Sequence, residues 1–166
     1  MKRASVAWVG PLALVWLFGC GDGSVGLCPD VAGGDTGFSF TVTGGGGAEV
    51  CGVAQSGDRE GWGIRLVSAA DATTLAIFGG VGGPPEPGTY PISSDLESPG
   101  ADFVALAIFD DASLGGTFTS ATGILTIDAS SASGSTGSFV FSAVENGTTG
   151  PTIDLRGVFR TIEGDL

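Results

Sequence analysis

The sequence predicts an all-β fold, and three observations support that prediction. Apolar and polar residues alternate with a period of two along several segments. Clusters of glycine and proline separate these segments, and no segment shows the apolar spacing of three and four residues that is typical of an amphipathic helix. Because alternation gives a strand one dry face and one wet face, we expect a single antiparallel β-sandwich or barrel-like domain of about eight or nine strands.

The alternation is clearest in four segments, each bounded by turn-forming residues. The expected inward-facing series are Phe38-Phe40-Val42, Trp62-Ile64-Leu66, Phe139-Phe141-Ala143 and Ile153-Leu155-Phe159. Two other segments, residues 75–78 and 103–109, are apolar at consecutive positions. Such runs favour central strands that are covered on both faces. The separating turns are expected at residues 44–47, 79–88, 98–100, 115–116, 134–137 and 146–147.

Two aromatic residues of the expected domain are interpreted as parts of the fold. Trp62 lies on an alternating strand among glycines, and packing in the core or at an edge is the more frequent role of such a side chain. Tyr90 follows a proline-rich loop and is expected near the start of a strand. Asn146-Gly147 is expected to form a hairpin turn.

The charge of the chain excludes one class of partner. Beyond residue 19 it carries four arginines, no lysine and eighteen acidic residues, a formal charge of −14. Such a surface repels phosphate backbones, so we expect no nucleic-acid binding. Peripheral docking on anionic lipid is also disfavoured, because it needs basic side chains. The acidity is interpreted first as a source of solubility outside the cell.

The amino-terminal residues have the pattern of an export signal. Lys2 and Arg3 precede an apolar run over residues 4–18, shorter than the roughly 20 residues of a membrane-spanning helix. The run ends in Leu17-Phe18-Gly19-Cys20, which resembles the lipobox of bacterial lipoproteins. The resemblance implies cleavage before Cys20, a diacylglyceryl group on its thiol and acylation of the freed amine. Secretion with cleavage nearby and an uncleaved signal anchor are the alternatives.

The cysteine count agrees with that interpretation. The chain has three cysteines, and an odd number in an exported protein leaves one without an internal partner. With Cys20 acylated, Cys28 and Cys51 remain as a disulfide pair, in a compartment that permits disulfides. We therefore expect a signal peptide at residues 1–19, a flexible tether at 20–27 and an all-β domain at 28–166. Gly21 follows the acylated cysteine, and resemblance to lipoproteins of enteric bacteria then implies the outer membrane if the source has two membranes.

The carboxy-terminal half carries a second resemblance. Residues 123–128, 137–143 and 156–159 follow the patterns G-x-L-x-I, G-S/T-F-x-F-x-A and G-x-F, with Ile124 at the first variable position. This resembles a tail of uncharacterised all-β bacterial lipoproteins and covers about a third of the chain. It implies a fold and a cell-surface setting and assigns no catalytic residue.

The residue types needed for most catalytic and metal sites are missing. The chain contains no histidine, which excludes Ser-His-Asp and Cys-His catalysis and removes the imidazole ligands of zinc and copper. Carboxylate pairs remain, namely Asp110 with Asp111 and Asp95 with Glu97, and such a pair is the requirement for glycoside hydrolysis. The first pair is interpreted as a strand-ending turn. Asp35 and the pair at 110–111 are candidate parts of a calcium loop, but no spaced Asp-x-Asp-x-Asp-Gly pattern occurs, so they are interpreted as solvated turn residues.

These observations favour a lipid-anchored, non-enzymatic module of the cell envelope, with no catalytic residue, no metal and no cofactor. Its expected partners are the membrane, through the lipid on Cys20, and an envelope protein, a glycan or a small apolar molecule. Two alternatives stay open. One is a carboxylate-based hydrolase of envelope glycans, and the other is a lipocalin-like carrier with an apolar cavity inside a closed barrel.

The lipid assignment gives the first testable prediction. Replacing Cys20 by Ser is expected to abolish the incorporation of labelled palmitate, because the acceptor thiol is gone and the peptidase has no modified cysteine to recognise. A Cys51→Ser variant, which keeps the lipobox, serves as the matched control and is expected to retain the label. Labelling of the Cys20→Ser protein would contradict the lipoprotein interpretation.

Overall fold

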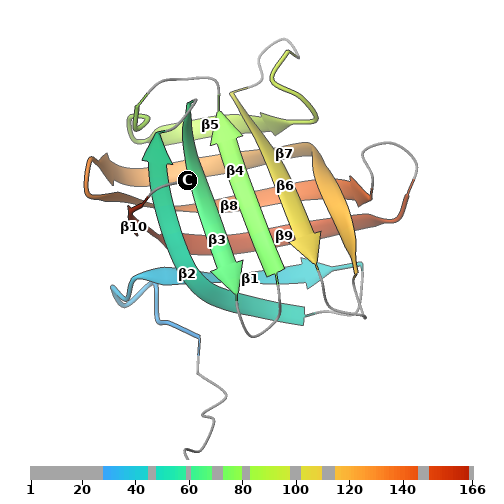
Figure 1. Ribbon diagram of the computed structural model, residues 1–166, viewed down its shortest axis with the longest axis horizontal. Helices are drawn as coiled ribbons and strands as arrows, with labels where there is room; N and C mark the ends of the chain where they lie inside the picture. Colours follow the sequence, from blue (N-terminus) through green and yellow to red (C-terminus); the bar gives the residue numbers. More distant parts are fainter. Residues whose placement is uncertain are drawn as a thin grey trace, which may run out of the picture.

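Figure 1 shows the computed structural model, which describes residues 28–44, 48–58, 61–68, 73–79, 83–97, 102–109, 115–145 and 150–164. The regular elements in these ranges are ten strands, so the all-β prediction is confirmed. The predicted signal at 1–19 and tether at 20–27 lie outside the described residues. The strands are β1 (Gly37–Thr43), β2 (Ala48–Asp58), β3 (Trp62–Ser68), β4 (Thr73–Gly79), β5 (Gly88–Ser93), β6 (Phe103–Phe109), β7 (Gly116–Ser131), β8 (Gly134–Glu145), β9 (Thr152–Arg160) and β10 (Ile162–Glu163).

The strands form one sheet that closes into a ring. The order of strands around the ring is β1-β2-β3-β4-β6-β7-β8-β9. β9 then pairs with β1 along the whole length of β1. The β1–β2 pairing, from Phe38 opposite Gly52 to Val42 opposite Ala48, completes the circle. Each of these eight strands therefore has a hydrogen-bonded neighbour on both sides. Pairing on both sides reduces the free edges on which a second chain could add a strand, although β5 pairs with β6 only at Ile92 and Ser93.

The ring is flattened into two layers whose strands cross (Figure 1). β2, β3, β4 and β6 form one layer, while β1, β9, β8, β7 and β5 form the other. β2 passes between the layers, pairing with β1 through residues 48–52 and with β3 through 53–58. Gly52 lies at this change, where a Cβ would approach the Val67 carbonyl oxygen to 2.3 Å. β7 carries a bulge between Ser120 and Thr122, and bulges of this kind bend a strand around a corner.

Ser120 holds the place where the sheet divides. β6 pairs with β7 near Phe109 and then runs parallel to the end of β5, which itself pairs with β7. The Ser120 side chain is buried, donates its hydroxyl to the Ser93 carbonyl and accepts the backbone N–H of Ala105. One buried hydroxyl thus satisfies backbone groups on both diverging strands, which would otherwise be costly to bury.

Aromatic side chains fill the interior of the ring. Among the described residues the core comprises 24 buried apolar side chains, with Tyr90 packed against it. Trp62 is 2% exposed, so its predicted role in the core is confirmed, as is the start of a strand near Tyr90. The contacts between aromatic side chains, with the distances between their ring centroids, are Phe38–Phe40 (5.5 Å), Phe40–Phe139 (6.0 Å), Phe139–Phe141 (5.7 Å), Trp62–Phe103 (5.9 Å), Tyr90–Phe103 (5.5 Å) and Phe109–Phe118 (5.7 Å).

Glycine on the inner face makes room for these rings. Gly157 lies between Phe40 on β1 and Phe139 on β8 in the sheet register. A Cβ at this position would come within 2.4 Å of the Phe40 Cβ and 2.8 Å of the Phe139 ring. The aromatic rings of Phe40 and Phe139 therefore occupy the space that a side chain at Gly157 would need. Packing of this density leaves no room for an added methyl group without displacement.

The inward-facing series predicted from alternation are confirmed, but one prediction about the apolar runs is wrong. All four alternating series are buried in the core. On β4 and β6 the outer face is only partly covered, because Phe78 and Ile108 point outward and are 40% and 36% exposed, whereas Val104 is 7% exposed. A closed ring has a single interior, so its strands have no second layer over their outer face. Consecutive apolar residues here reflect an apolar outer surface.

The predicted disulfide joins Cys28 to Cys51. The two Cα atoms lie 5.5 Å apart and the cysteines are separated by 23 positions. Cys51 lies on β2 opposite Ser39 of β1, directly at the pairing that closes the ring. The bond therefore ties the segment before β1 to the closure of the barrel.

This arrangement predicts a loss of stability when the bond is removed. The double variant Cys28→Ser/Cys51→Ser is expected to lower the free energy of unfolding by about 3 kcal/mol, because the unfolded chain regains the entropy of the open loop. Urea titrations of the parent and the variant measure the difference, and reductant should weaken the parent alone. Equal midpoints for both proteins would contradict the assigned role of the bond.

Candidate functional site

The residues that the sequence offered for chemistry do not converge on a cleft among the described residues. Asp95 and Glu97 are exposed in the bend and turn that follow β5. Asp35 accepts the backbone N–H of Asp30, so its carboxylate stabilises a turn. Within the described ranges, no group of three or more histidine, cysteine, aspartate or glutamate side chains is placed to hold a metal ion. Cys20, Asp110-Asp111 and Asn146-Gly147 lie outside the described residues.

The hollowed surface lies instead on the outer face of β1, β9, β8 and β7, and we call it the outer groove. The strand register aligns its side chains in three rows across these four strands. The rows are Thr43-Asp154-Ser142-Thr122, Thr41-Arg156-Val140-Ile124 and Ser39-Val158-Ser138-Thr126. Neighbouring strands lie about 4.8 Å apart and alternate residues about 6.7 Å apart, so the rows form a regular lattice of side chains.

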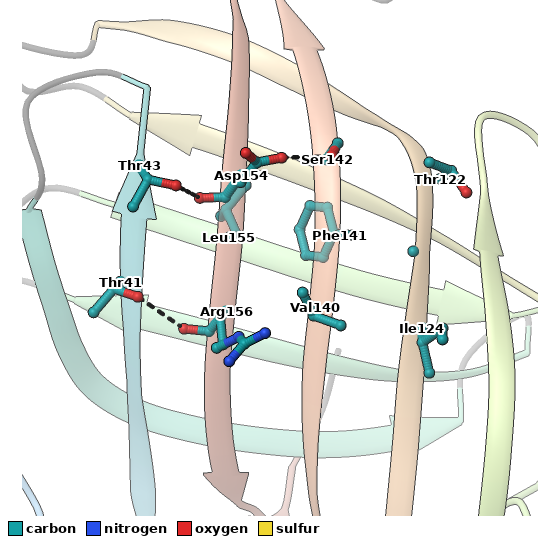
Figure 2. A pocket seen from close by; sticks show the side chains of 11 residues that line it. Thr41, Thr43, Thr122, Ile124, Val140, Phe141, Ser142, Asp154, Leu155 and Arg156 are labelled. Atoms are coloured by element: carbon teal, nitrogen blue, oxygen red, sulfur yellow. Dashed lines mark hydrogen bonds between the residues drawn. The ribbon is translucent and has the colours of Figure 1, made fainter.

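Two adjoining depressions make up the outer groove, with volumes of about 540 Å³ and 460 Å³. Figure 2 shows the first of them, with the side chains of the first two rows spread over the four strands. The middle row, Thr41-Arg156-Val140-Ile124, borders both depressions. These four side chains therefore occupy the centre of the groove.

Hydrogen bonds hold polar side chains of the first two rows in place. The Thr43 hydroxyl donates to the carbonyl oxygen of Asp154, and the Thr41 hydroxyl donates to that of Arg156. The donor–acceptor distance is 3.5 Å in both cases (Figure 2). The Ser142 hydroxyl donates to a carboxylate oxygen of Asp154. Each donating hydroxyl keeps lone pairs that accept from a ligand. The groove thus offers acceptors at its edge on strands that cannot easily move.

Arg156 is the one cation among the described residues that line the outer groove. It is exposed, and it forms no ion pair with any residue that the structure describes. Asp154 lies two positions away on the same face of β9, yet its carboxylate accepts from Ser142 instead. Val140 and Ile124, which follow in the same row, are 40% and 45% exposed. An unpaired guanidinium beside two apolar side chains can bind an acidic group while the body of the ligand lies on Val140 and Ile124.

The opposite layer has a smaller apolar depression of about 210 Å³, between Arg65 and Phe78 above Gly63. Phe78, Val104 and Leu106 lie on this outer face, opposite the packed core. Its lining has few polar groups with which to orient a ligand, unlike the hydroxyl rows of the outer groove.

Comparison with protein-family models, with curated proteins and with solved structures gives no match for this chain. Among the residues that the structure describes, no helix has the length and apolar character needed to cross a membrane.

The alternating pattern places Arg156 and Arg160 on a strand but does not assign them to a site. The feature of the sequence that could have pointed to them is the small number of arginines. Two of only four arginines beyond residue 19 lie on the wet face of one strand. Their neighbours on β1, β8 and β7 come from distant parts of the sequence, and only the register of the closed ring brings them together.

Proposed function

We propose that this chain is a lipid-anchored, non-enzymatic module of the bacterial envelope that binds a glycan in the outer groove. The observation that carries the proposal is the middle row, where Arg156, which has no ion pair among the described residues, lies between a threonine and two exposed aliphatic side chains. The anchor on Cys20 rests on the lipobox alone and is tested by the palmitate experiment above.

The side chains of the groove match the chemistry of a sugar chain. Sugars present hydroxyls at the ring edge and C–H groups on the ring face. The Ser and Thr rows can exchange hydrogen bonds with the former, and Val140 and Ile124 can contact the latter. Site rigidity favours binding, because ordered strands lose little conformational entropy when a ligand arrives.

The charge of the chain selects among glycans. A polyanionic glycan would be repelled by a surface of formal charge −14. One unpaired guanidinium instead suits a glycan with isolated carboxylates on an otherwise uncharged sugar backbone. Peptidoglycan strands from which the stem peptides have been removed have this chemistry, since their muramic acid units carry free lactyl carboxylates and their other sugars are uncharged. We therefore assign a peptide-free peptidoglycan strand as the ligand class.

Because the interior of the barrel is packed, a binding site on the outer face is favoured over one inside the barrel. A lipocalin-like carrier needs an apolar cavity, whereas here 24 buried side chains pack within the ring. The alternative of a carboxylate-based hydrolase needs two acids in one cleft. The outer groove holds one, Asp154, so its geometry supports binding better than hydrolysis.

The proposal predicts a measurable effect of Arg156. The Arg156→Gln variant is expected to bind soluble muramic acid fragments at least tenfold more weakly than the parent, because charge-assisted hydrogen bonds to the carboxylate are lost. Isothermal titration with purified protein in detergent measures the affinity. Arg65→Gln is the matched control, because it removes the same charge from an exposed position on β3. This variant should bind as the parent does.

Chitin oligomers of the same length provide the second arm, because they share the amino-sugar backbone and lack the lactyl carboxylate. The parent should prefer the muramic acid fragment, and this preference should disappear in Arg156→Gln. Equal affinity of the parent and Arg156→Gln for the fragment would overturn the proposed site.

A further inference from the structure

A separate pocket surrounds Arg160 at the end of β9, and we call it the serine pocket. It has a volume of about 360 Å³ and lies where the β7–β8 hairpin meets β9 and β10. Arg160 points to the outer face, opposite Gly37 of β1 and Thr136 of β8. The pocket is distinct from the outer groove, because the two share no lining residue.

The serine pocket has an unusual composition for so acidic a chain. Among the described residues that line it are seven serine or threonine side chains, one arginine and no carboxylate. Arg160 is half-buried and forms no ion pair within the described ranges. Asp35 precedes the lining residue Thr36, but its carboxylate is held by the backbone of Asp30. Asp128 and Glu163 adjoin the lining in sequence and are exposed outside it.

Arg160 also has a donor without an acceptor. Its Nε atom is buried and makes no hydrogen bond among the residues that the structure describes. A buried donor without an acceptor is unfavourable. The two terminal nitrogens of the guanidinium form a fork that fits two oxygens of one oxyanion, and Arg160 belongs to the lining of the pocket.

Buried hydroxyl groups make the wall of the pocket rigid. The Thr161 side chain is 5% exposed, accepts the Ser135 backbone N–H at 2.7 Å and contacts the Ser56 hydroxyl at 2.7 Å. Ser135 is 2% exposed, and its hydroxyl lies 2.7 Å from that of Ser130. These bonds fix β10, β2 and the β7–β8 hairpin to one another. At the rim, the Ser133 hydroxyl is hydrogen-bonded to that of Ser131 over a distance of 3.0 Å, and Thr36 is exposed.

We propose that the serine pocket binds a phosphate group, held by the guanidinium of Arg160 and by hydroxyl donors of Thr36 and Thr136. A phosphate has enough oxygens to accept from the arginine fork and from several hydroxyls at once. The absence of a lining carboxylate among the described residues removes the main competitor for the guanidinium.

The position of the pocket suggests where the phosphate comes from. The described chain begins at Cys28, and Pro29 lies against Gly37, which is the β1 partner of Arg160. A tether over residues 20–27 spans at most about 28 Å when extended. A lipid headgroup therefore lies within reach of the pocket, and its phosphate diester would orient the barrel on the membrane. This source rests on the proposed lipid anchor, whereas the phosphate site itself does not.

The test titrates the full acylated protein, in a detergent that contains no phosphate, with two probes. Inorganic phosphate tests the site, and glycerophosphocholine, a free headgroup, tests the lipid source. Arg160→Gln is expected to weaken binding of each probe at least tenfold, and Arg160→Lys should recover only part of the affinity because it lacks the fork. Arg65→Gln is the control, and circular dichroism verifies the fold of each variant.

Phosphate binding that is lost in Arg160→Gln and kept in Arg65→Gln supports the site. Phosphate binding without headgroup binding supports the site and overturns the lipid source. Equal phosphate affinity in the parent and in both Arg160 variants, or no phosphate binding by the parent, overturns the proposal. The outer groove is scored separately, because Arg160→Gln should still bind the muramic acid fragment and Arg156→Gln should still bind phosphate.

Discussion

The packing of phenylalanine rings inside a closed ring of strands is the constraint on which the rest of the structure depends. β1 pairs with β2 on one side and β9 on the other, so the chain closes on itself only when its first strand is in place. The Cys28–Cys51 bond lies at that closure. Once closed, the ring has one dry interior, and the aromatic residues fill it. Surfaces available for recognition are therefore on the outside.

The outer surface divides its chemistry between the two layers. β4 and β6 present apolar side chains, whereas β1, β9, β8 and β7 present hydroxyls around Arg156 and Arg160. Beyond residue 19 the sequence has eighteen acidic residues and four arginines. Arg156 and Arg160 both lie on β9 and form no ion pair among the described residues, so they mark a local departure from the overall charge. The proposed carboxylate and phosphate sites both follow from that departure. They differ in their surroundings, since the first is an open groove and the second a hydroxyl-lined pocket.

Much of the fold could be predicted from the sequence, because alternation reports directly which side chains face inward. Phe38, Phe139 and Leu155 were assigned to the core on this basis and are buried. The outward exposure of Phe78 could not be predicted, because an apolar run does not reveal whether a second layer covers it. The candidate sites depend on register between strands distant in the chain, such as Thr41 beside Arg156. Local patterns carry no information on such pairings.

The unfolding free energies of Phe103→Ala and Phe78→Ala test the filled, closed barrel most directly. Both rings lie on neighbouring strands, but Phe103 is fully buried against Trp62 and Tyr90, whereas Phe78 is 40% exposed on the outer face. Truncation of Phe103 should cost about 3–5 kcal/mol, and truncation of Phe78 less than about half as much. Equal losses for the two variants would contradict the packed interior and, with it, the assignment of function to the outer face.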